Sequence, residues 1–190
     1  MVLSLGGSLQ QRESALKLIT ENNSLHNEKD AYVERIACYQ KADSNYAKQI
    51  KYASLKKIWN ESEFTINNSK FTIVVLFSLS DCGACLNKEL NDLQKFKLYK
   101  KELLNIVLIS VDKDINSGKK FINHYSPGYP VYCTEEIEYY NELKMGRNPM
   151  ILFSDSNGVV LNAMKRNQYD ETSAKTFYSN IDKVIKQTVN

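Results

Sequence analysis

The pattern of hydrophobic and polar positions changes about one third of the way along the chain. From about Glu13 to Asn60 the sequence is polar, rich in Tyr and Lys, and without Pro or Gly. These features predict helix, in two segments that divide near Asn22-Asn23-Ser24. In the second segment Asp43 interrupts an approximate 4-3 spacing of apolar positions, namely Tyr32, Ile36, Tyr39, Tyr46, Ile50 and Ala53. This spacing predicts an amphipathic arm that packs on the rest of the protein, with a dimerising stalk as the second interpretation.

Beyond residues 61–70, predicted as a loop or short edge element, apolar runs alternate with amphipathic segments. Phe71 to Phe77 is a continuous apolar run, which is typical of a strand buried on both faces. The turn from Asp155 to Gly158 predicts that the last two strands form a hairpin. The other predicted elements are strands over 106–111, 129–133, 150–153 and 159–161, and helices after Cys82, over 117–125, over 135–144 and from Asp170 onward.

This order of elements predicts an α/β fold with a mixed central sheet flanked by helices. We therefore expect a helical N-terminal arm over residues 1–60 and an α/β domain over residues 61–190. The hydrophobic fraction of 43% fits a globular protein, and a formal net charge of +3, spread along the chain, gives no case for nucleic-acid binding. No stretch has the apolar length of a membrane-spanning helix. The start, Met1 to Gly7, lacks a basic leader, so it is either the stub of a removed segment or a ragged terminus.

The strongest chemical signal is Cys82-Gly83-Ala84-Cys85, placed between the first buried strand and a helix. The C-x-x-C spacing points to redox or metal chemistry. The first cysteine would lie at the helix N-terminus, where free N–H groups and the helix dipole stabilise a thiolate. We therefore expect Cys82 to be the attacking nucleophile and Cys85 the resolving thiol. Gly83 would let the loop turn tightly and let a partner backbone approach.

Other roles for the cysteines were also weighed. A zinc site would need two further ligands, and the remaining candidates, His26, His124, Cys38 and Cys133, form no second motif, so no metal is predicted. An inert buried pair is the remaining structural interpretation of the motif. For Cys38 and Cys133 the default is a buried thiol, and a third redox cysteine or a Cys38–Cys133 bridge is the alternative.

The region from about Lys70 to Asn190 resembles the thioredoxin superfamily, and within it the TlpA/ResA-like branch of thiol–disulfide oxidoreductases. The segment between Asp112 and Pro149 carries the extra strand–helix unit that favours this branch. The motifs that carry the resemblance are Val74-Val75-Leu76-Phe77 before Cys82-Gly83-Ala84-Cys85, Leu108-Ile109-Ser110-Val111-Asp112, Tyr129-Pro130-Val131-Tyr132, Arg147-Asn148-Pro149-Met150-Ile151-Leu152-Phe153 and Asn157-Gly158.

The resemblance implies that Pro149 is a cis-proline facing the dithiol, and an X–Pro bond is the only kind that adopts cis cheaply. It also implies that the backbone of Asn148 pairs with an extended substrate segment, and that Gly83 and Ala84 contact that substrate. A trans-proline that begins a strand is the alternative interpretation.

Three positions depart from the family pattern. Asp81 replaces a tryptophan and Ala84 replaces a proline; an acidic neighbour opposes thiolate formation, which predicts a relatively reducing pair. Leu76 stands where thioredoxins often carry a buried acid. The group that moves protons during thiol–disulfide exchange is therefore unassigned, and Glu89 or a water would have to take this role.

The resemblance implies an extracytoplasmic thiol–disulfide oxidoreductase, periplasmic or membrane-anchored and facing outward, that reduces or reshuffles disulfides in partner proteins. It needs no bound cofactor, only a redox partner protein. A membrane tether upstream of the chain and a homodimer through the helical arm are compatible with this expected function. A non-catalytic thioredoxin-like interaction module, acting through the arm, is the alternative from another class, and a cytosolic thioredoxin-like reductant is a third interpretation.

Overall fold

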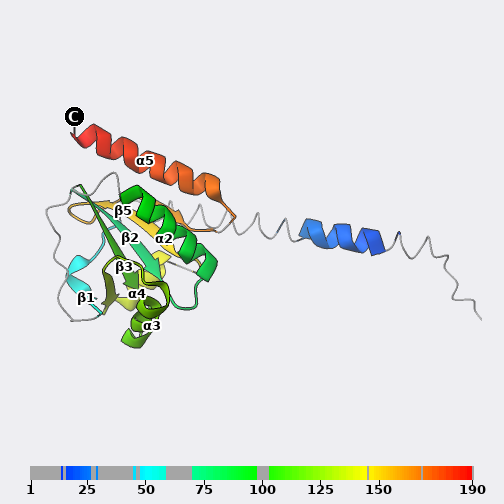
Figure 1. The fold of residues 1–190 in the computed structure, drawn as a ribbon, viewed down its shortest axis with the longest axis horizontal. Coiled ribbons are helices and arrows are strands. Elements are labelled where there is room, and N and C mark those ends of the chain that lie inside the picture. The colour runs from blue at the N-terminus through cyan, green and yellow to red at the C-terminus, as the bar shows by residue number, and fades with distance from the viewer. Residues whose placement is uncertain are drawn as a thin grey trace, which may run out of the picture. The chain divides into compact units, whose positions relative to one another are not determined.

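The computed structural model describes residues 14, 16–26, 29, 45, 48–58, 70–97, 103–144, 146–167 and 169–189. The chain forms two compact units, Met1–Cys38 and Tyr39–Asn190. In the first unit residues 16–26 are helical (Figure 1), so the first predicted helix is confirmed there and its predicted division near Asn22 is wrong. The helix predicted over residues 30–44, Tyr46, Cys38 and the segment predicted over 61–69 lie outside the described residues.

The second unit is built around a six-stranded sheet with the order β1-β4-β3-β2-β5-β6. The three central strands β4, β3 and β2 are parallel, whereas β1, β5 and β6 each pair antiparallel with their neighbour. The strands are β1 (Leu55–Lys57), β2 (Phe71–Phe77), β3 (Leu104–Ser110), β4 (Val131–Thr134), β5 (Met150–Asp155) and β6 (Val160–Lys165). The predicted α/β fold with a mixed sheet is confirmed.

Helices cover the sheet on both faces (Figure 1). They are α2 (Gly83–Lys97), α3 (Ile115–Tyr125), α4 (Ile137–Lys144) and α5 (Glu171–Val189), with a short 3-10 helix η1 (Tyr52–Ser54) before β1. Asp114 caps α3, its side chain accepting a hydrogen bond from Asn116 N at 2.9 Å, and Asp170 accepts one from Ser173 N at 3.0 Å. The predicted N-cap at Asp170 is therefore confirmed.

The continuous apolar run of β2 is explained by two cores, one on each face of the sheet. Ile73, Val75 and Phe77 pack into a cluster with apolar residues of α2, α3 and α5. Val74 and Leu76 point to the opposite face and pack against α4 and the segment before β1. All seven residues of β2 are buried, as the run predicted.

The prediction of helix as far as Asn60 is wrong for residues 48–58. Gln49 forms an isolated antiparallel bridge with Val159, and β1 pairs with β4 from Leu55↔Thr134 to Lys57↔Tyr132. Burial on the sheet accounts for this difference, because the buried apolar residues here are Ile50, Tyr52, Leu55 and Ile58, while Ala53 is exposed. Contacts distant in sequence override a helical pattern that rests on weak apolar positions.

Candidate redox site

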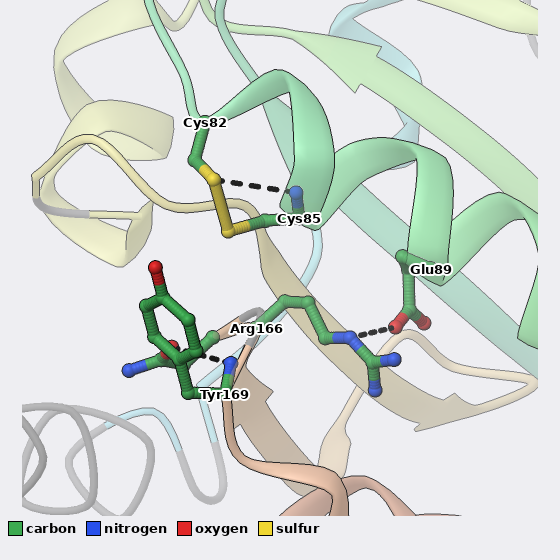
Figure 2. The surroundings of a disulfide bond; sticks show 6 residues. Cys82, Cys85, Glu89, Arg166 and Tyr169 are labelled. Carbon is green, nitrogen blue, oxygen red and sulfur yellow. Dashed lines mark hydrogen bonds and ion pairs between the residues drawn. A yellow bond between two sulfur atoms is a disulfide. The ribbon is translucent and has the colours of Figure 1, made fainter.

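Cys82 and Cys85 are joined by a disulfide at the N-terminus of α2 (Figure 2). The carbonyl of Cys82 accepts the first hydrogen bond of the helix from Leu86 N at 3.1 Å, so Cys82 is its N-cap residue. The Cys82 sulfur accepts a hydrogen bond from Cys85 N at 3.3 Å. Cys82 is half-buried, whereas Cys85 is 2% exposed. The two sulfur atoms therefore differ in how readily a partner can reach them.

The loop between β2 and α2 is held by a carboxylate from the next strand. Asp112, just after β3, accepts a hydrogen bond from Ser78 Oγ at 2.6 Å and another from Leu79 N at 2.9 Å. Because β2 and β3 are parallel, their carboxyl ends meet at one edge of the sheet, which brings Asp112 to this loop. In the sequence Asp112 stands out only as part of a motif, and no local pattern indicates that it holds this loop.

The segment from Arg147 to Pro149 lies against the first cysteine. Cys82 N donates to Arg147 O at 2.9 Å, and Arg166 N donates to Pro149 O at 2.9 Å. Pro149 is buried and Asn148 is half-buried. In the described part of the chain the backbone of Asn148 makes no hydrogen bond, which leaves its N–H and C=O available to an incoming segment.

The predicted cis bond before Pro149 is wrong, because no peptide bond among the described residues is cis. The trans form is the lower in free energy for an X–Pro bond by about 0.5–1 kcal/mol. The trans bond is compatible with the hydrogen bonds from Cys82 N to Arg147 O and from Arg166 N to Pro149 O, so these two bonds do not require the cis form. The trans-proline directly precedes β5, which begins at Met150; a trans-proline at the start of a strand was the alternative interpretation.

Asp81 forms a buried ion pair with a lysine from α4. Its side chain is fully buried, Lys144 is 4% exposed, and Lys144 Nζ lies 2.5 Å from Asp81 Oδ1. The same ammonium donates to Gly146 O at 2.7 Å. Burial raises the pKa of Asp81, and Lys144 opposes that rise. The positive charge of Lys144 offsets the negative charge of the Asp81 carboxylate. This weakens the expectation from the sequence that Asp81 makes the Cys82 thiol less acidic.

A second buried acid lies one helical turn after Cys85. Glu89 is fully buried, and burial raises its pKa to about 7, although Arg166 and Tyr178 act in the opposite direction. The Tyr178 hydroxyl donates to Glu89 Oε1, and Arg166 Nε lies 3.4 Å from Glu89 Oε2. Cys85 and Glu89 share one face of α2 because they are four residues apart. Figure 2 shows Arg166 extending toward Glu89 on the side of the helix where the disulfide lies.

Gly83 makes room for a side chain that the sequence analysis did not identify. A Cβ on Gly83 would lie 2.9 Å from the hydroxyl oxygen of Tyr125, the last residue of α3. Gly83 is not among the glycines with positive φ, so the backbone does not require glycine for the turn. Only the tertiary fold brings Tyr125 to the dithiol, and no pattern along the chain could have indicated it. Ala84 is exposed.

Two described apolar side chains of the second unit are exposed, one near Cys82 in the sequence and one near the disulfide in space. In the described part of the second unit, Leu79 at 40% and Tyr169 at 85% are the only exposed large hydrophobic residues. Leu79 lies three residues before Cys82, and Figure 2 places the ring of Tyr169 in the surroundings of the disulfide. Tyr169 is therefore exposed where a protein that approaches the disulfide would meet it.

The remaining chemical candidates lie apart from this arrangement or outside the described residues. The Cys133 thiol, on β4, donates to Lys56 O at 3.4 Å, and Cys38 is not described. His124 is exposed and contacts the ring of Tyr125 edge-on. Among the described side chains, no three from His, Cys, Asp and Glu converge as a metal site would require. Of the helices that are described, none has the length and apolar character to span a membrane.

Comparison with solved structures identifies the class of fold. A thioredoxin-like protein from Porphyromonas gingivalis has a TM-score of 0.58 at 18% identity and covers 75% of this chain and 95% of its own. A thiol-disulfide oxidoreductase from Bacteroides fragilis has a TM-score of 0.53 at 16% identity, with coverages of 68% and 98%. The thioredoxin domain of a thiol-disulfide oxidoreductase from Bacteroides vulgatus has a TM-score of 0.53 at 16% identity and covers 72% of this chain and 97% of its own. The chain therefore has a thioredoxin-like fold, as the resemblance predicted.

No protein-family model matches the sequence. No curated protein matches it either. At these identities the likeness concerns the fold, so the activity has to be argued from the site itself.

Proposed function

We propose that this protein is a thiol–disulfide oxidoreductase that reduces or exchanges disulfides in partner proteins through Cys82 and Cys85. The observation that carries the proposal is the disulfide at the N-cap of α2, with one half-buried and one buried cysteine. A thiolate at Cys82 would be stabilised by the helix N-terminus and by Cys85 N. Its partial exposure supports the role of nucleophile, and the burial of Cys85 supports the role of resolving thiol.

The reaction runs in two exchange steps. The Cys82 thiolate attacks one sulfur of a substrate disulfide, so that the substrate S–S bond breaks, a Cys82–substrate bond forms and one substrate thiolate leaves. Cys85, once deprotonated, then attacks the Cys82 sulfur, the second substrate thiolate leaves, and the Cys82–Cys85 disulfide forms. Two electrons pass to the substrate, and a dithiol redox partner protein would return them. No bound cofactor enters these steps.

Glu89 is our candidate for the group that accepts the proton of Cys85. Three observations support it: its position one turn along the same helix face, its full burial, and a pKa raised to about 7. A base with a pKa near neutrality can take a proton from a thiol and release it again. Glu89 would thus take the role of the buried acid that thioredoxins often carry at the position of Leu76.

The substrate would lie across Gly83, Ala84 and the Asn148–Pro149 segment. The available backbone groups of Asn148 support pairing with an extended chain, and the contact of Arg147 with Cys82 holds that segment beside the nucleophile. Leu79 and Tyr169 would contact apolar residues around the substrate cysteine.

The direct test is trapping of the mixed disulfide. A Cys85→Ser variant should accumulate a covalent adduct with a disulfide-containing model protein, because the second exchange step is removed. Cys82→Ser should form no adduct, and only the wild type should turn over. An adduct that forms equally in Cys82→Ser would contradict the assigned roles.

One observation favours the alternative of a non-catalytic interaction module. The helical residues 16–26 carry four exposed large apolar side chains, Leu16, Leu18, Ile19 and Leu25. If the helical arm alone carried the function, wild type and Cys82→Ser would have no measurable difference in disulfide reduction. The extracytoplasmic location, an upstream membrane tether and dimerisation through the arm remain predictions from the sequence.

A further inference from the structure

A cavity of about 660 Å³ lies between α2 and α5. Its walls come from residues 88–96 of α2, from Arg166 after β6, and from residues 171–178 of α5. Neither cysteine of the dithiol lines it, so the cavity is distinct from the redox site. Its volume falls within the range of small-molecule sites, roughly 300–1,000 Å³.

The cavity carries an excess of positive charge. Its lining includes four cations, Lys88, Lys95, Arg166 and Lys175, against two carboxylates, Asp92 and Glu171. Both carboxylates are engaged, because Glu171 pairs with Lys88 at 2.8 Å and Asp92 with Arg166 at 2.5 Å. Lys175 lies near enough to Glu171 to lower the pKa of that carboxyl. Among the described residues, Lys95 and Lys175 have no carboxylate within ion-pair distance.

Arg166 adds a fixed positive charge beneath the cavity. It is 1% exposed, its Nη2 donates to Asp92, and its Nε lies 3.4 Å from Glu89 Oε2. Its Nη1 has no hydrogen-bond partner among the described residues and almost no accessible surface. Arg166 would therefore act on a ligand through its charge and not through a direct hydrogen bond, and the accessible cations are the lysines.

One wall of the cavity is apolar. The rings of Phe96 on α2 and Tyr178 on α5 lie 4.9 Å apart, and Ala174 packs beside them. The Tyr178 hydroxyl is directed to Glu89, so its ring is fixed in place. A ligand here would therefore meet both an aromatic surface and cationic groups.

We propose that this cavity binds a small amphipathic organic acid, with its carboxylate toward Lys95, Lys175 and Arg166 and its apolar body against Phe96 and Tyr178. The inference is independent of the proposed redox function, since neither cysteine lines the cavity. Arg166 and Tyr178 line it and also contact Glu89. A small molecule fits better than a peptide because the volume of the cavity lies in the range of small-molecule sites.

The test is an NMR titration of the ¹⁵N-labelled full chain with 3-phenylpropionate, beside the neutral 3-phenylpropanol. The acid should cause saturable shifts in residues 88–96 and 171–178, and the alcohol should bind at least about tenfold more weakly, as the loss of one charged hydrogen bond implies. The double variant Lys95→Gln/Lys175→Gln should lower the affinity for the acid by about tenfold or more.

The matched control is Lys183→Gln/Lys186→Gln, which also removes two positive charges, both from α5 outside the cavity, and should leave the affinity unchanged. Equal binding of acid and alcohol, shifts that do not saturate, or equal weakening by both double variants would overturn the proposal. Binding of an acidic peptide at these residues, without binding of the small acid, would also overturn it and would make the cavity a peptide-docking site.

Discussion

The hydroxyl of Tyr125 occupies the space that a side chain on Gly83 would need, at 2.9 Å from the position of its Cβ. This relationship links the end of α3 to the start of α2, beside Cys82. The ring of Tyr125 is itself supported by Phe121, at 4.8 Å between centroids, and Phe121 stacks on Phe77 at 3.9 Å. The position of Tyr125 is therefore set by the core.

The contact predicts the effect of adding one methyl group. Gly83→Ala should destabilise the protein by about 1 kcal/mol, because a rigidly held aromatic side chain has to move. Tyr125→Phe removes the atom in conflict, so the double variant should recover most of the loss. Urea unfolding of the three variants measures both effects, and a Gly83→Ala cost that Tyr125→Phe does not relieve would contradict the explanation.

The buried pair of Asp81 and Lys144 predicts a large loss on removing one partner. Lys144→Met should cost about 3 kcal/mol of unfolding free energy, because it leaves a buried carboxylate without compensation. Adding Asp81→Asn should restore part of it. The exposed pair of Lys56 and Glu135 is the control, and Lys56→Met should change stability little. Similar losses in both lysine variants would show that burial does not decide the effect.

Glu89 predicts how stability depends on pH. Its pKa is about 7 in the folded protein, against an ordinary value of 4.5, so the folded state holds more protons between these values. The wild type should therefore lose stability relative to Glu89→Gln as the pH rises from about 4.5 to about 7, by about 3 kcal/mol, and the difference should level off above pH 7. Urea midpoints across pH 4–9 measure it, and a difference independent of pH would refute the assignment.

The exposed ring of Tyr169 near the disulfide predicts a selective kinetic effect. Tyr169→Ser should lower kcat/KM several-fold for a protein disulfide substrate while leaving the reduction of a small aromatic disulfide unchanged, because only the larger substrate would contact this ring. Since Tyr169 is 85% exposed, the unfolding free energy should change little. Equal losses with both substrates would assign Tyr169 to the exchange steps themselves.

The sequence predicted the parts of the fold that depend on local patterns. The apolar run at β2, the hairpin turn before β6 and the cap at Asp170 each have a local physical cause, and each is confirmed. Residues 48–58 were predicted wrongly because their conformation depends on pairing with β4, about 80 residues away.

The candidate site divides in the same way. The C-x-x-C motif is readable because its spacing and its place before a helix are local features. The contacts of Tyr125, Asp112, Lys144 and Arg166 are formed by elements far apart in the chain, so no spacing could have revealed them. The cis form of the bond before Pro149 was carried over from the resemblance, and the structure has a trans bond there.

The central claim is that Cys82 and Cys85 form a reversible redox couple that exchanges with protein disulfides. The most direct measurement is the fraction of disulfide in the pair after equilibration across glutathione buffers of increasing reducing power. The account predicts a single two-electron transition in the wild type, absent in Cys82→Ser, and reduction of a protein disulfide by the reduced form. A pair that stays in one state across all buffers, or a reduced form that transfers no electrons to a protein disulfide, would contradict it.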